Sequence, residues 1–138
     1  MNKREEAKNM FFDGYNCCQS VIGVFCNELG VDFDTVMKLA SSFGGGMGRM
    51  KEVCGCVTAM FMAAGLKEGF INPETPLEKQ AHYLKIQELA KQFSETNGSI
   101  ICRELLGECS AKDGKILKKK PCYEYVGDAV EILEKNFS

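Results

Sequence analysis

Apolar residues recur at helical intervals along almost the whole chain. Between residues 17 and 29 they follow the i, i+3, i+4, i+7 spacing of one helix face. The positions in this stretch are Cys18, Val21, Ile22, Phe25 and Leu29. Asn16 is suited to cap such a helix at its start, and Gly30 is suited to end it. A shorter, charged helix is predicted over residues 2–12.

The middle of the chain contains its most apolar segment. A helix that opens at Asp32 or Asp34 is predicted first. Residues 52–66 are then apolar on every side, which predicts a buried central helix. Gly55 and Gly65 are expected to let neighbouring elements approach this helix closely.

The last part of the chain shows clear helix starts. Thr75–Glu78 has the pattern of a capping box and predicts a long amphipathic helix to about Thr96. Ser99 is placed to cap a short helix, and Pro121 is placed to open the last one. The expected fold is all-α: a single compact, bundle-like, cysteine-rich domain of six or seven helices over residues 1–138.

Charge and composition exclude several classes of protein. The 17 basic and 19 acidic residues give a net charge of −2, with no basic block, so nucleic acid is not an expected partner. The first eight residues lack the apolar core of a signal peptide, and no segment is long enough to predict membrane insertion. A cytoplasmic location is therefore predicted.

Sulfur dominates the candidate chemistry, with eight cysteines against one histidine. In a reducing compartment such thiols more often bind metal or carry out redox chemistry than form structural disulfides. Because His82 is the single imidazole, zinc sites of the Cys₂His₂ and His₃ types are excluded. His82 itself is expected on the solvated surface of the long helix, and Lys118–Lys120 in a solvated linker.

Four cysteines fall where predicted helices begin. These candidate catalytic thiols are Cys17, Cys54, Cys102 and Cys122. Free backbone N–H groups and the positive end of the helix dipole favour an anion there, so a lowered thiol pKa is expected. We predict that the four thiols meet in one pocket. Packing roles are expected for the remaining cysteines Cys18, Cys26 and Cys109, whereas Cys56 adds a fifth thiol near the predicted pocket.

A glycine-rich loop precedes the central helix. Its candidate anion- or cofactor-binding residues are Gly44, Gly45, Gly46, Gly48 and Arg49. The alternative is a tight turn between helices that needs positive φ angles. A third interpretation joins the two, with the loop and Arg49 lowering the pKa of Cys54.

Three motifs together resemble a known family. They are Gly14-Tyr-Asn-Cys-Cys-Gln-Ser, Phe43-Gly-Gly-Gly-Met-Gly-Arg-Met and Val53-Cys-Gly-Cys-Val-Thr-Ala. They resemble the CGAxxG family of small proteins, also labelled C_GCAxxG_C_C and named for a proposed redox activity. The resemblance implies that the family's four cysteines correspond to the four helix-start cysteines, and its members are often encoded beside transporters. Here Cys56 stands where the motif has alanine, and Ala59 where it has its last glycine.

Three functions remain open from the sequence. The first is a redox protein, a candidate thiol-dependent oxidoreductase, that exchanges disulfides or transfers electrons with a partner protein or small molecule. The second is a module that holds zinc or an iron–sulfur cluster on Cys17, Cys54, Cys102 and Cys122, with Cys56 as a further ligand. The third is a small-anion-binding protein that uses the glycine loop. Met60-Phe61-Met62 is expected in the core, with a homodimer surface as the alternative.

Overall fold

The computed structural model describes residues 1–107 and 120–137, and these residues form an all-α structure. The helices are α1 (Lys3–Phe12), α2 (Cys17–Gly23), α3 (Cys26–Leu29), α4 (Phe33–Ala40), the 3₁₀ helix η1 (Ser41–Phe43), α5 (Gly55–Glu68), α6 (Pro76–Asn97), α7 (Cys102–Leu105) and α8 (Cys122–Phe137). Over these ranges no strand is present, and the one element of β pairing is an isolated bridge between Val53 and Ile101. The all-α prediction is confirmed. Cys109, Lys118 and Lys119 lie outside the described residues.

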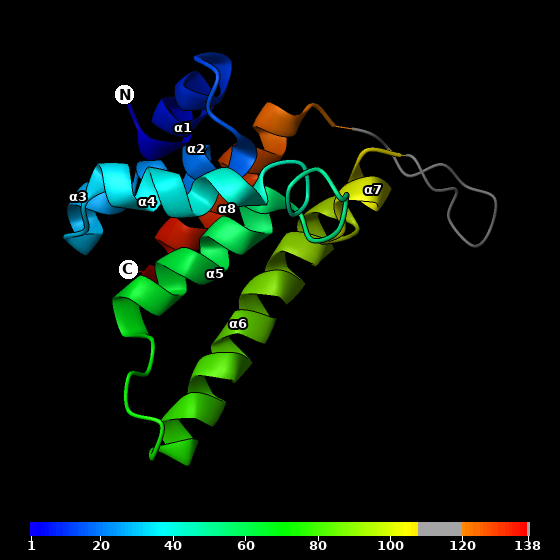
Figure 1. Ribbon diagram of the computed structural model, residues 1–138. Helices are drawn as coiled ribbons and strands as arrows, with labels where there is room; N and C mark the ends of the chain where they lie inside the picture. Colours follow the sequence, from blue (N-terminus) through cyan, green and yellow to red (C-terminus); the bar gives the residue numbers. More distant parts are fainter. Residues whose placement is uncertain (108–119, 138) are drawn as a thin grey trace, which may run out of the picture.

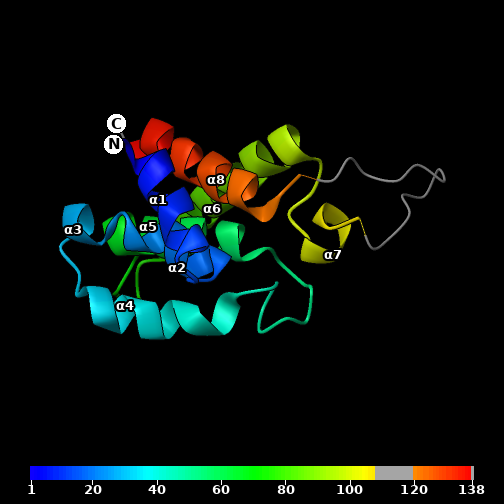
Figure 2. The ribbon, with the colours of Figure 1, turned by 90° about the horizontal axis from the view of Figure 1, so that it is seen from above.

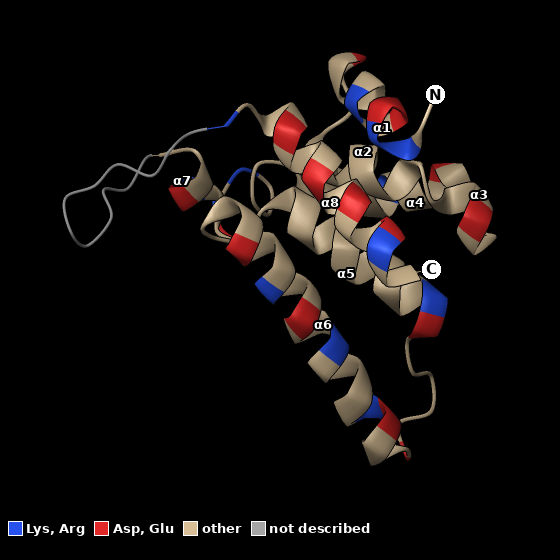
Figure 3. Cartoon of the chain, turned by 180° about the vertical axis from the view of Figure 1, so that it is seen from behind, with Lys and Arg blue, Asp and Glu red and all other residues tan. Residues whose placement is uncertain are grey.

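Helices α2 and α5 pack against each other at the centre of the molecule. Viewed from above, α4 covers this pair on one side, and α1 and α8 cover it on the other (Figure 2). Both sides of α5 are therefore enclosed, and most of its residues from Gly55 to Ala64 are buried. Its first charged residue is Lys67, close to its end (Figure 3). The predicted buried central helix is thus α5.

Helix α6 is the longest, and it extends away from the other helices (Figure 1). Only Leu89 and Phe93, in its second half, are buried, and the predicted apolar face is exposed nearer its start, where Leu77 is 80% exposed. His82 on α6 is half-buried rather than solvated, because its ring packs edge-on against Phe70 at a centroid distance of 6.2 Å. In the described part of the chain, no helix has the length and apolar character needed to cross a membrane.

The helix predicted over residues 17–29 is divided in two. It begins at Cys17 as expected, with a capping box in which Asn16 accepts from the Gln19 N–H and the Gln19 side chain accepts from the Asn16 N–H. It stops at Gly23, where the Phe25 N–H bonds to the Ile22 carbonyl in a tighter, three-residue turn. The methionine side chains of residues 10 and 37 pack against Gly23, leaving no room for a Cβ atom there. The second piece ends at Gly30 with φ +68°, as predicted.

Two predicted caps are wrong. Thr75 forms no capping box, because its hydroxyl donates to the Asn72 carbonyl at 2.8 Å instead. Ser99 does not cap α7, whose N-cap is Ile101. The Ser99 hydroxyl instead accepts from the Ile101 N–H and donates to Glu104. In both places the hydroxyl forms a hydrogen bond in the turn before the helix instead of capping the helix. Serine and threonine side chains commonly form such local hydrogen bonds.

Candidate functional site: a cavity lined by five cysteines

Five cysteines line one cavity of about 540 Å³. They are Cys17, Cys54, Cys56, Cys102 and Cys122. The four candidate cysteines at helix starts are thus brought together with the fifth. In the chain they lie up to 105 positions apart (122 − 17 = 105). Cys18 and Cys26 lie outside, in the core, where Cys18 Sγ is 3.7 Å from Met62 Sδ. Cys109 lies outside the described residues.

Cys17 is positioned by the start of α2. The Asn16 capping box fixes the first turn of this helix. The Asn16 side-chain amide also donates to the Ser41 carbonyl at 3.2 Å, which ties this turn to the end of α4. The same asparagine therefore sets both the helix start that carries Cys17 and its distance from the glycine loop.

Cys54 and Cys102 are joined by the bridge between Val53 and Ile101. The Cys54 N–H donates to the Ile100 carbonyl at 2.8 Å, and the Cys102 N–H donates to the Glu52 carbonyl at 2.6 Å. Both amides are therefore used by the bridge and are not free to stabilise a thiolate. This corrects the prediction that each candidate thiol sits among free N–H groups. Cys54 is moreover the N-cap residue of α5, and Cys102 opens a helix of only four residues.

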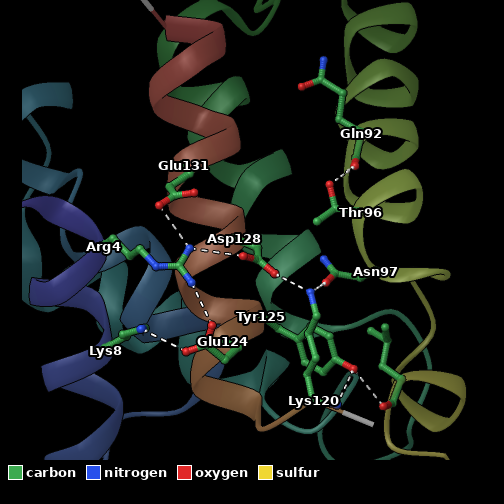
Figure 4. A network of polar contacts seen from close by, with 11 residues as sticks. Arg4, Lys8, Gln92, Thr96, Asn97, Lys120, Glu124, Tyr125, Asp128 and Glu131 are labelled. Atoms are coloured by element: carbon green, nitrogen blue, oxygen red, sulfur yellow. Dashed lines mark hydrogen bonds and ion pairs between the residues drawn. The ribbon is translucent and has the colours of Figure 1, made fainter. Parts of the chain in front are cut away.

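Cys122 is brought to the cavity by contacts around the start of α8. The Tyr125 hydroxyl donates to the Leu105 carbonyl at 3.0 Å and so links α8 to α7 (Figure 4). The Lys120 ammonium donates to Asn97 Oδ1 at 2.6 Å and pairs with Asp128 at 3.2 Å. Together these bonds hold the first turn of α8 against α6 and α7.

The pKa of Cys17 is lowered to about 6. The main cause is the Cys56 thiol, which donates a hydrogen bond to the Cys17 sulfur. Backbone N–H groups of Gly45, Cys18 and Cys17 itself add to the effect, and burial opposes it. At neutral pH Cys17 is therefore mostly a thiolate, the form that acts as a nucleophile.

Cys56 and Cys102 do not share this acidity. The hydrogen bonds that Cys56 makes with Cys17 and Cys54, followed by burial, raise the pKa of Cys56 well above its usual range. Burial is the first cause that raises the pKa of Cys102 to about 11, followed by the negative charge of Cys54 and Cys17. The prediction of a lowered pKa is therefore wrong for Cys102. A helix start therefore does not by itself lower a thiol pKa, because burial and neighbouring negative charge can outweigh the helix N-terminus.

The glycine loop is a run of left-handed backbone. Residues 45–49 all have φ between 60° and 72°, including Met47 and Arg49, and Lys51 follows at 62°. Each non-glycine residue in this region costs about 1–2 kcal/mol. Hydrogen bonds from the Arg49 N–H to Gly44 O at 2.9 Å and from the Glu52 N–H to Gly46 O at 3.0 Å hold the loop closed. The positive φ angles expected for a tight turn are present.

The loop contacts the site in two ways. Gly44, Gly45, Gly48 and Arg49 line the cavity, with Arg49 exposed at its edge. Gly46 lies behind Cys102, and a Cβ atom there would come within 2.6 Å of Cys102 Cβ. The loop amide that stabilises an anion is that of Gly45, and the anion is the Cys17 thiolate. The pKa that the loop lowers is thus that of Cys17.

Gly55 lies where α5 comes close to Cys17. A Cβ atom at this position would overlap Cys17 Sγ and lie 2.7 Å from the Phe43 carbonyl oxygen. Gly55 therefore permits the close approach predicted from the sequence. Gly65 does not serve that purpose, because no heavy atom lies within 4 Å of the Cβ it would carry.

A metal centre has less support from the geometry. Among residues 1–107 and 120–137, no three His, Cys, Asp or Glu side chains are grouped so that they could hold a metal ion. Zinc or an iron–sulfur cluster on these cysteines stays a prediction.

Several cavity residues were not predicted as site residues. They are Phe11, Asn16, Ser41, Gly55, Leu105, Leu106 and Tyr125. Apolar residues from α1, α7 and α8 thus form much of the wall. The sequence marks such residues as core or cap, and only the packing of distant helices shows that they surround a cavity.

The comparison with known families gives one match. A family described as "Putative redox-active protein (C_GCAxxG_C_C)" matches residues 15–136, which include every cysteine of the cavity. No curated protein and no solved structure matches the chain. Because the matched range covers most of the chain, the protein belongs to the C_GCAxxG_C_C family.

Proposed function

We propose that the protein is a thiol-dependent oxidoreductase that exchanges disulfides, with Cys17 as the attacking thiolate. The observation that carries the proposal is the state of Cys17, a thiolate held by the Cys56 thiol and the Gly45 amide. Its sulfur lies at the wall of a cavity that holds four further thiols. An attacking thiol reacts best when its pKa is close to the ambient pH, and Cys17 meets this condition near neutrality.

In the first step the Cys17 sulfur forms a mixed disulfide with the substrate. The Cys17 thiolate attacks one sulfur of the disulfide, whose S–S bond breaks, and the other sulfur leaves as a thiolate. In the second step another cavity thiol gives up its proton and attacks the Cys17 sulfur of this mixed disulfide. The second substrate sulfur then leaves. The protein is oxidised by two electrons to an internal disulfide, and the substrate is reduced to two thiols.

The walls of the cavity favour a substrate of limited size. Its volume of about 540 Å³ accommodates a small molecule or one projecting side chain rather than a folded surface. Apolar contacts come from Phe11, Leu105 and Leu106, and Arg49 at the rim is suited to attract an anionic group. The redox partner we propose is therefore a small disulfide, or a partner protein that inserts one cysteine side chain.

Exchange with oxidised glutathione under anaerobic conditions tests the proposal. The reduced protein at pH 7 is expected to release two molecules of glutathione per chain and to gain one internal disulfide. Cys17→Ser is expected to slow this release by about 100-fold or more, because the variant lacks the thiolate that attacks the disulfide, and the pKa values of Cys56 and Cys102 are raised. Thiol release and intact mass measure both outcomes.

Cys26→Ser is the matched control, since Cys26 is buried in the core away from the cavity. It should react like the wild type. If Cys17→Ser releases glutathione at the wild-type rate, Cys17 is not the attacking thiol and the proposal is wrong.

A further inference from the structure

Cys56 is the most deeply buried thiol of the cavity. Only 1% of its surface is exposed, compared with 6% for Cys54 and 8% for Cys102. It lies in the first turn of α5, beside Gly55, against which the Cys17 sulfur rests. A reagent that enters the cavity therefore meets Cys17 before it meets Cys56.

Cys56 is also the thiol in direct contact with Cys17. Its side chain is hydrogen-bonded to both Cys17 and Cys54, and the three thiols line the same cavity. The Cys56 hydrogen bond is the largest influence on the Cys17 thiol, whereas Cys102 is affected by Cys17 through its negative charge. A nucleophile that attacks the Cys17 sulfur must lie within contact distance of it, and Cys56 already does.

We infer that Cys56 is the resolving cysteine, which attacks the mixed disulfide on Cys17 and closes a Cys17–Cys56 disulfide. This inference rests on the proposed function, because it assigns the second step to one of the cavity thiols. It also gives Cys56 two roles in sequence. Before the reaction it donates a hydrogen bond that positions and stabilises the Cys17 thiolate, and afterwards it is the nucleophile.

The second step balances within these groups. The Cys56 S–H bond is broken, and a bond forms between the sulfurs of Cys56 and Cys17. The bond from Cys17 to the substrate sulfur breaks, and that sulfur takes both electrons of the bond. The proton lost by Cys56 ends on one of the released substrate thiolates. Two protein thiols are oxidised and one substrate disulfide is reduced.

The acidity of Cys56 is suited to this order of events. While Cys17 is a thiolate, its hydrogen bond and its negative charge raise the pKa of Cys56 and keep the resolving thiol unreactive. Once Cys17 is part of a mixed disulfide, both of these influences disappear. The pKa of Cys56 then falls, and a larger fraction becomes the nucleophilic thiolate.

Two substitutions at this position separate the two roles. Cys56→Ser keeps a hydroxyl donor for Cys17 but cannot form a disulfide. Cys56→Ala removes both donor and nucleophile, and it places at this position the residue that the family's motif carries. With oxidised glutathione, both variants are expected to release one glutathione per chain and to keep the other bound to Cys17 as a mixed disulfide. The rate of the second release should fall by more than about 100-fold, because in the wild type a thiol held beside the mixed disulfide acts at a high effective concentration.

The pH dependence of Cys17 provides a second readout, independent of resolution. In Cys56→Ser the pKa of Cys17 should stay near its wild-type value, whereas in Cys56→Ala it should move up towards the ordinary thiol range. Far-ultraviolet circular dichroism shows whether each variant is folded. If the serine variant does not fold, the alanine variant still tests whether the second release is lost.

Peptide mapping of the oxidised wild type decides the pairing. A disulfide between Cys17 and Cys56 is expected. A disulfide from Cys17 to Cys54, Cys102 or Cys122 instead would overturn the inference. So would a second release that is as fast in both variants as in the wild type. Either result leaves the proposed function intact. If wild-type Cys17 forms no mixed disulfide at all, both the proposed function and this inference fail.

Discussion

The acidity of each cavity thiol is set by its own contacts. Cys17 and Cys102 each occupy the first residue of a helix, yet the pKa of Cys17 is lowered to about 6 and that of Cys102 is raised to about 11. The Cys17 sulfur accepts hydrogen bonds from a thiol and from backbone amides, which lower its pKa. The pKa of Cys102 is instead raised by burial and by neighbouring negative charge. The helix-start pattern was enough to choose cysteines that line the cavity. It could not predict their acidity, which depends on groups that are distant in the chain.

Gly55 allows a further prediction at this scale. In Gly55→Ala the added methyl group meets Cys17 Sγ and the Phe43 carbonyl oxygen, so α2 and α5 must move apart. We expect the free energy of unfolding to fall by about 1–3 kcal/mol, as for other overpacked core positions. The reactivity of Cys17 should fall as well. Urea unfolding and the alkylation rate of Cys17 measure the two effects.

Gly65→Ala is the matched control for this change. Gly65 lies in the same helix, but the methyl group it would gain has no heavy atom within 4 Å. Alanine is the better helix former, so stability should rise by about 0.5–1 kcal/mol, with Cys17 unaffected. Equal effects of the two substitutions would mean that Gly55 does not form the contact described.

At the scale of elements, the sequence predicted most helices but not how they begin and end. Apolar spacing located α4 and α8, whose buried residues recur at helical intervals, and the continuous apolar run located α5. The break after Gly23, beside which the Met10 and Met37 side chains of other helices pack, was not predicted from the local apolar spacing. The left-handed conformation of Met47 and Arg49 was also not predictable, since these residue types do not favour it. It is held by hydrogen bonds within the folded loop.

Helix α8 depends on an ionic cluster with α1. The Arg4 guanidinium pairs with Glu124 at 3.0 Å and with Asp128 and Glu131 at 3.2 Å each, and Lys8 joins the cluster through Glu124 (Figure 4). The Arg4 side chain is only 18% exposed and packs over Gly127. This cluster holds the helix whose first residue is Cys122.

Arg4→Ala is therefore expected to lower the free energy of unfolding by about 1–3 kcal/mol, because the partly buried carboxylates of Glu124 and Asp128 each lose one of their two cations. Lys91→Ala is the control, since the Lys91–Glu95 pair is exposed at both ends and should contribute less than about 0.5 kcal/mol. Urea unfolding of both variants at equal ionic strength makes the comparison. A similar loss in the two variants would contradict a special role for the α1–α8 contact.

At the scale of the molecule, the meeting of the cavity cysteines is a result of packing. Four of them lie at or before the start of α2, α5, α7 and α8, and the contacts among these helices, the Val53–Ile101 bridge and the Tyr125–Leu105 hydrogen bond bring these ends together. The sequence suggested which ends carry thiols. The shared cavity requires the long-range contacts, and these are not visible in local patterns.

The most direct test of the account measures the alkylation rate of every cysteine in the reduced protein as a function of pH. The rate follows the thiolate fraction, so that of Cys17 should rise about tenfold per pH unit below its pKa and level off above about pH 6. The rate of Cys102 should keep rising until about pH 11. If Cys17 and Cys102 instead titrate together near pH 8.5, the Cys17 thiolate is not specially stabilised and the account is wrong.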